Sequence, residues 1–193
     1  MSTKSVNFAE YQVGIRLIIT DEASMTSHHE ITYSGINVSG FPLDSLVYWL
    51  ETDDPASMRD LNLAVYGKNN DDLRYTIDTY LPARKLITAF FKKPVEDGES
   101  FLYTISYDAP ERDRYFQYYC SERNQRLKFA FDFPDSMRRP MDSFKTPFAV
   151  KLRGKDILDP EPIFPSIEKS GAKSVATWSF DDAGFGFIYR IQW

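Results

Sequence analysis

Arginines and tyrosines are concentrated in the middle of the chain, in a pattern that suits the binding of an anion. Residues 111–155 hold 11 Lys and Arg against 6 Asp and Glu, although the whole chain carries a formal charge of −5. An arginine can bind a phosphate through two parallel hydrogen bonds, and an exposed tyrosine ring can stack on a base. The candidate ligand-binding residues are Arg112, Arg114, Tyr115, Tyr118, Arg138, Arg139 and Arg153.

A plainer interpretation of the same residues is a solvated surface whose charges neutralise one another. Arg112 and Arg114 alternate with acidic residues, and neighbours of mixed sign usually mark such a face. The pair Arg138-Arg139 has no acidic neighbour within two residues, so it is the strongest candidate for an anion contact. An anion site also requires these side chains to converge on one concave surface, which depends on the fold.

The histidines and the single cysteine offer little for catalysis. His28 and His29 are the only histidines. Adjacent residues of an extended chain point to opposite faces, so one metal ion would not take both, and solvated loop residues are the simpler interpretation. Cys120 has no partner for a disulfide, and nearby arginines could lower its pKa but not accept its proton. We therefore expect Cys120 to be a small buried hydrophobic residue.

Carboxylates such as Asp53 and Asp54 could hold a metal ion in a hydrolase, because hard cations prefer oxygen ligands. Their spacing matches no established metal-binding loop, and carboxylates are common in turns. The sequence also lacks a nucleophile elbow, a phosphate-binding glycine loop and a zinc-binding helix motif. We therefore predict no catalytic residues, no metal and no cofactor, and the sequence favours a protein that is not an enzyme.

The elements that must position these residues are strands. Apolar side chains fall on every second position at 12–20, 101–107, 127–133 and 185–193, and no twelve-residue window keeps helical spacing. The sequence predicts an all-β protein with little helix: an antiparallel two-sheet β-sandwich, Ig-like or jelly-roll-like, of about 11–12 strands. A β-barrel is the alternative.

Local patterns add two expectations. Residues 175–180 and 185–193 are joined by Asp-Asp-Ala-Gly, which predicts a terminal β-hairpin with the final strand in a central position. Gly35 interrupts the alternation between 31–33 and 36–38, which predicts a bulge or bend.

Length and composition set the broad class. The 193 residues fit one domain, 1–193, with a core that needs no disulfide. We find no signal peptide and no apolar run long enough to span a membrane, so we expect a cytoplasmic protein. The net negative charge makes double-stranded nucleic acid an unfavourable partner.

The order of several features resembles a class of bacterial β-sandwich domains that accompany regulatory or signalling modules. The features are 46–50 followed by Asp53-Asp54-Pro55, the Gly98 turn before 101–107, and the closing 184–193. The resemblance implies a sensing or interaction role and brings no catalytic residues.

Three functions follow from these observations. The first is a non-enzymatic binding module that recognises a protein partner, a second copy of itself or an anionic ligand. The second is a sensor of a nucleotide or another phosphorylated small molecule, with arginines on phosphate and Tyr115 or Tyr118 stacking. The third is a metal-dependent hydrolase that uses carboxylates.

Overall fold

The computed structural model describes residues 6–52, 61–81, 83–122, 125–137, 146–153 and 161–193. Among these residues the chain forms strands and two short 3-10 turns. The strands are β1 (Phe8–Asp21), β2 (Thr26–Asn37), β3 (Leu43–Glu51), β4 (Ala64–Gly67), β5 (Arg74–Leu81), β6 (Arg84–Val95), β7 (Ser100–Pro110), β8 (Tyr115–Tyr119), β9 (Gln125–Pro134), β10 (Phe148–Arg153), β11 (Ser166–Ser170), β12 (Lys173–Ala183) and β13 (Phe187–Gln192). The prediction of an all-β protein is confirmed.

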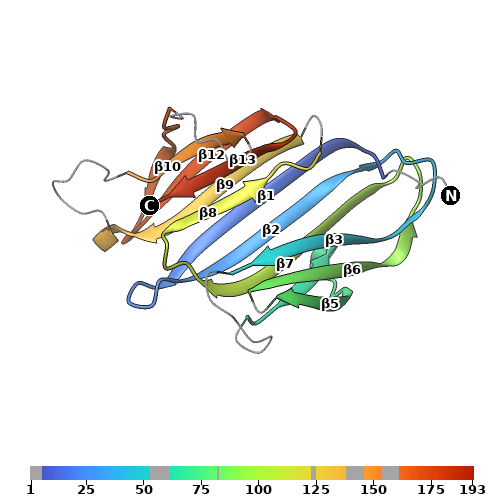
Figure 1. The fold of residues 1–193 in the computed structure, drawn as a ribbon, viewed down its shortest axis with the longest axis horizontal. Helices are drawn as coiled ribbons and strands as arrows, with labels where there is room; N and C mark the ends of the chain where they lie inside the picture. The colour runs from blue at the N-terminus through green and yellow to red at the C-terminus, as the bar shows by residue number, and fades with distance from the viewer. Residues whose placement is uncertain (1–5, 53–60, 82, 123–124, 138–145, 154–160) are drawn as a thin grey trace.

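Seven strands form one twisted sheet in the order β11-β12-β9-β1-β2-β7-β4 (Figure 1). Its pairs are antiparallel except β1 with β9, which run parallel from the pair Gln12 and Arg126 to the pair Ile18 and Asp132. The guanidinium of Arg16 bonds the carboxylate of Asp132 across this parallel pair, with Nη2 and Oδ2 2.6 Å apart. The first strand of the sequence therefore pairs, at the centre of the sheet, with a strand more than a hundred residues further along the chain.

The alternation seen in the sequence produces the buried face of this sheet. On β1 the side chains of Leu17 and its alternating neighbours are buried, and on β9 the same holds for Leu127, Phe129 and Phe131. Burying each such side chain contributes about 1.5–3 kcal/mol. This face is where the remaining strands pack.

Two three-stranded sheets cover that face, one in the order β3-β6-β5 and the other in the order β10-β13-β8. The hydroxyl of Tyr48 on β3 lies 3.3 Å from that of Tyr107 on β7. The ring of His29 on β2 stacks on Tyr107 at 4.5 Å and contacts Phe116 of β8 at 5.6 Å. The two small sheets therefore lie side by side on one face, and the fold is a sandwich whose second layer is divided.

One of the two local expectations is wrong. The strands β12 and β13 do not form a hairpin: β12 pairs with β9 and β11, whereas β13 pairs with β10 and β8. The turn between them carries the chain from one layer to the other. The final strand is nevertheless central in its own small sheet. The bulge or bend expected at Gly35 is present in the pairing of β1 with β2, whose register shifts between the pair Ala9 and Ile36 and the pair Gln12 and Ser34. The pairing of β2 with β7 continues past Gly35 without a shift, and the lack of a side chain at Gly35 accommodates the ring of Phe101.

No helix in the described ranges has the length and apolar character needed to cross a membrane.

Candidate functional site

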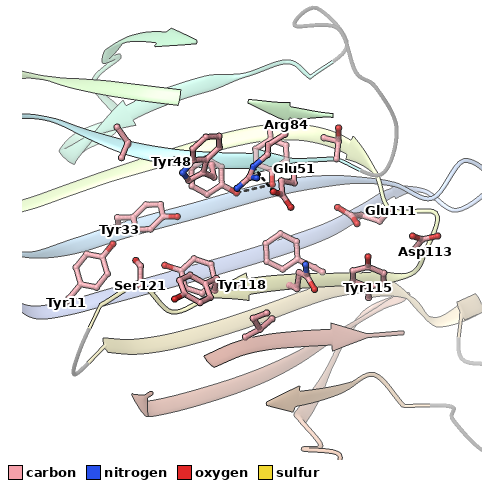
Figure 2. A pocket seen from close by; sticks show the side chains of 18 residues that line it. Tyr11, Tyr33, Tyr48, Glu51, Arg84, Glu111, Asp113, Tyr115, Tyr118 and Ser121 are labelled. Atoms are coloured by element: carbon pink, nitrogen blue, oxygen red, sulfur yellow. Dashed lines mark hydrogen bonds and ion pairs between the residues drawn. The ribbon is translucent and has the colours of Figure 1, made fainter. Parts of the chain in front are cut away.

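The two small sheets leave a cavity of about 610 Å³ between them, above the buried face of the seven-stranded sheet. Figure 2 shows Tyr48 and Glu51 on one side of the cavity, Tyr115 and Tyr118 on the other, and Tyr33 between them. Cavities of this size hold a small molecule or a few residues of a peptide.

Tyrosines from the large sheet form the floor of the cavity. Tyr11 comes from β1, Tyr33 from β2 and Tyr107 from β7. Burial raises the pKa of all three hydroxyls well above the usual value. These phenols therefore stay protonated at neutral pH, and each can donate or accept a hydrogen bond.

One wall consists of β3 together with the start of β6. Val47 and Trp49 are 59% and 43% exposed, which is high for large apolar side chains. The guanidinium of Arg84 lies 4.4 Å above the Trp49 ring and its Nε is 2.9 Å from Oε1 of Glu51. This wall presents an apolar surface with a charged pair beside it.

The opposite wall is β8, and all five of its residues line the cavity. The side chains of Phe116 and Tyr118 are buried, while those of Gln117 and Tyr119 are exposed. Side chains from both faces of the strand reach the cavity, so the cavity runs along the edge of the strand. Tyr119 is 55% exposed and extends the apolar rim formed by the other wall.

Carboxylates gather at one end of the cavity. Glu111 and Asp113 come from the turn before β8, where the Arg114 N–H donates to the Glu111 carbonyl at 3.0 Å. Oε1 of Glu111 also lies 3.1 Å from Nε2 of His29. With Glu51, the lining contains three acidic residues and one basic residue, Arg84, so its formal charge is negative.

The structure separates the residues that the sequence grouped as an anion site. Tyr115 and Tyr118 line the cavity, whereas Arg112 and Arg114 are not among its lining residues. Arg153 lies on β10, with its guanidinium 5.8 Å from the Phe187 ring. Arg138 and Arg139 lie outside the described residues. Of the five predicted residues that the structure describes, Tyr115 and Tyr118 come together in this cavity.

Sequence reasoning missed most of the lining, including Tyr33, Tyr48, Glu51, Arg84 and Glu111. These residues come from β2, β3, β6 and the turn before β8, and each fits an ordinary strand or turn pattern. Only the pairing of distant strands brings them together. The one local signal was the excess of tyrosine in the composition.

The two histidines point to opposite faces of β2, as predicted, but the interpretation of them as solvated loop residues is wrong, because both lie on a strand. His29 is fully buried, and its Nε2 lies 2.7 Å from Ser27 Oγ as well as 3.1 Å from Glu111. In a serine hydrolase the serine and the acid bond to different nitrogens of the histidine. Because here both partners share Nε2, this cluster positions Glu111 and does not activate Ser27.

His28 has a different arrangement on the outer face of the large sheet. Its Nδ1 lies 2.7 Å from Asp108 Oδ1, and its Nε2 lies 3.2 Å from Ser106 Oγ. That connectivity matches a catalytic triad. Ser106 is only 6% exposed, however, and it does not line the cavity. The group is a cross-strand hydrogen-bond network between β2 and β7.

The sequence also offers a carboxylate metal site and the thiol of Cys120 as candidates. Among the described residues, no group of three or more His, Cys, Asp or Glu could hold a metal ion. Asp53 and Asp54 lie outside those residues. Cys120 is fully buried, and burial raises the pKa of its thiol to about 12.

No protein-family model matches the sequence, and no curated protein matches it. Solved structures of M1 zinc metallopeptidases share the fold. A two-domain M1 zinc metallopeptidase mutant bound to L-tryptophan gives a TM-score of 0.57 at 10% identity, covering 98% of this chain and 43% of that chain. The M1 zinc metallopeptidase from Deinococcus radiodurans gives 0.56 at 8% identity, covering 98% and 42%. This chain therefore spans less than half the length of those proteins, and at such identity the likeness concerns the fold alone.

Proposed function

We propose that this chain is a non-enzymatic binding module that recognises a protein partner in the cavity between its two small sheets. The observation that carries the proposal is the rim, where Val47, Trp49 and Tyr119 are all exposed on facing walls. Exposed large apolar side chains grouped around a hollow are typical of interaction sites. Trp and Tyr are also the residues that most often dominate binding energy.

The charges of the lining select the class of partner. The cavity contains Glu51, Glu111 and Asp113 against one arginine, and its floor is built from tyrosine rings. Carboxylates attract a lysine or arginine side chain, and aromatic faces also attract cations. A basic segment of a protein fits this lining, whereas a phosphate would be repelled. We therefore favour a basic protein partner over the nucleotide sensor for this cavity.

In the similar solved structures this fold is part of a larger protein, in one case of two domains, and a binding module fits such a setting. In this proposal the chain acts on or beside another protein, in a cytoplasmic and regulatory setting. The resemblance to β-sandwich domains that accompany signalling modules implies the same kind of role. The proposal assigns no reaction to the chain.

A peptide selection tests the proposal. The immobilised 193-residue chain is presented with a display library of random twelve-residue peptides, and enriched peptides are synthesised for affinity measurement. We expect enriched peptides to carry a net positive charge. Their Kd should rise at least tenfold in a Trp49→Ala/Tyr119→Ala variant, because removing hot-spot aromatics costs about 1–2 kcal/mol or more each.

The matched control is Phe164→Ala. Phe164 is 61% exposed and lies outside the cavity lining, so its loss removes an exposed aromatic without touching the site. Affinity should be unchanged in this variant. A selection without enrichment, or peptides that bind the double variant as tightly as the wild type, would contradict the proposal.

A further inference from the structure

The cavity contains an unpaired strand edge. In the described part of the chain, β8 is the outer strand of its sheet and pairs only with β13, from Tyr119 with Ile188 to Tyr115 with Gln192. Its other edge faces the cavity, as the lining by five consecutive residues indicates. Across the cavity stands β3, which is also the outer strand of its sheet.

Hydrogen bonds at the two ends of β8 fix the direction of its backbone groups. The Cys120 N–H donates to the Phe187 carbonyl at 2.9 Å, and the Trp193 N–H donates to the Arg114 carbonyl at 3.1 Å. In an antiparallel pair, residues alternate between bonding to the neighbour and pointing away from it. The even-numbered residues 114–120 therefore bond to β13. The N–H and C=O groups of Tyr115, Gln117 and Tyr119 point to the open edge.

The sequence of β8 lacks the usual protection of such an edge. Natural edges carry charged side chains, proline or a bulge, or they are very short. The edge strands β3, β5, β10 and β11 each contain at least two charged residues, and β4 is only four residues long. β8 reads Tyr-Phe-Gln-Tyr-Tyr, with no charge and no proline. It is therefore suited to pairing with another chain.

We propose that the open edge of β8 accepts an extended segment of the protein partner as an added strand, with β3 on its other side. Five residues of such a segment span about 13 Å, the length of β8 itself. A lysine or arginine of the segment reaches Glu111 and Asp113 at the end of the cavity. Backbone hydrogen bonds supply affinity, and the acidic end and the tyrosine floor supply selectivity. This inference rests on the proposed function and adds its mode of recognition.

A pair of substitutions at Gln117 separates backbone pairing from side-chain contact. Gln117→Pro removes the N–H that points to the open edge, and it leaves the bonds of Phe116 and Tyr118 to β13 in place. Gln117→Ala removes the same side chain but keeps the N–H. With the most enriched twelve-residue peptide as the probe, we expect at least tenfold weaker binding for Gln117→Pro and less than threefold weaker binding for Gln117→Ala.

Hydrogen exchange of the wild-type chain gives a second readout that does not depend on the folding of a variant. The amides of Tyr115, Gln117 and Tyr119 should exchange quickly in the free protein and at least tenfold more slowly with saturating peptide. The amides of Phe116 and Tyr118 should be protected in both states, because they bond to β13. A backbone N-methylated form of the peptide should produce no such slowing.

The outcomes distinguish the two proposals. If no peptide is enriched, both fail. If enriched peptides depend on Trp49 and Tyr119 but bind Gln117→Pro normally and leave the three edge amides unprotected, the binding module stands and strand addition is wrong. Slow exchange at those amides in the free protein also overturns strand addition, because it means that the edge is already covered.

Discussion

The large sheet and the two small sheets are all built from strands with alternating apolar side chains, but they bury these side chains to different extents. In the large sheet β1 and β9 lie between paired neighbours, and the inner side chains of Leu17, Leu127 and Phe131 are fully buried. The small sheets have only three strands each, and on β3 and β8 they leave Trp49 and Tyr119 exposed beside a cavity. In our proposal the large sheet acts as a scaffold, and the facing edges of the small sheets, β3 and β8, form the recognition surface.

This difference between the sheets follows from how many backbone groups of each strand are hydrogen-bonded. A strand in the middle of a sheet bonds on both sides, so its backbone has no capacity for a partner. An edge strand keeps half of its backbone groups unpaired and can bind another chain through them. By splitting its second layer, the fold places two such edges face to face. The buried tyrosines Tyr11, Tyr33 and Tyr107 form the floor between these edges.

The largest expected effect is a loss of stability when a core residue of the large sheet is truncated. Phe131 is fully buried and packs against Trp193, with ring centres 4.6 Å apart. Phe131→Ala should lower the free energy of unfolding by about 3–5 kcal/mol, because it leaves a cavity in the core. Trp49→Ala should change it by about 0.5 kcal/mol or less, since an exposed rim residue holds little of the fold together. Urea denaturation of both variants checks this contrast.

A Trp49→Ala variant as unstable as Phe131→Ala would remove the distinction between the scaffold and the recognition surface.

A smaller expected effect is the pH dependence of the free energy of unfolding that arises from Cys120, which lies just after β8. Burial raises the pKa of its thiol from 9.0 to about 12. Between these values the unfolded chain releases a proton that the folded chain keeps. The stabilisation is therefore full below pH 9 and is lost as the pH rises toward 12. From pH 9 to pH 10 the loss should be about 1 kcal/mol.

The measurement is the difference in free energy of unfolding between wild type and Cys120→Ala, taken by urea denaturation at pH 8, 9 and 10. Buried tyrosines contribute equally to both proteins, so their effect cancels in the difference. A difference that does not change with pH would contradict the burial of the Cys120 thiol.

The fold class could be predicted from the sequence because strand alternation is a local signal. The runs at 101–107 and 127–133 became β7 and β9, and the lack of helical spacing held throughout the described residues. The pairing of strands could not be predicted in the same way. The parallel pair of β1 with β9 joins segments more than a hundred residues apart, and the turn after β12 looks like a hairpin turn.

The candidate site was harder to predict for the same reason. Tyr115 and Tyr118 were identified because they are neighbours in a tyrosine-rich stretch. Tyr33, Glu51 and Arg84 were not, because each looks ordinary until the sheets assemble around the cavity. The charge of the site could not be predicted from the sequence either. The segment 111–155 is basic overall, but it contributes Glu111 and Asp113 to the cavity lining, whereas the arginines of the same turn do not line the cavity.

The most direct test of the central claim is amide chemical-shift mapping of the chain titrated with its most enriched basic peptide. We predict that the largest shifts fall on Gln117 and Tyr119 of β8, on Trp49 of β3, and on Glu111 and Asp113, with Phe164 unaffected. Largest shifts at Phe164 or on the outer face of the large sheet around Ser106, with β3 and β8 unchanged, would contradict it.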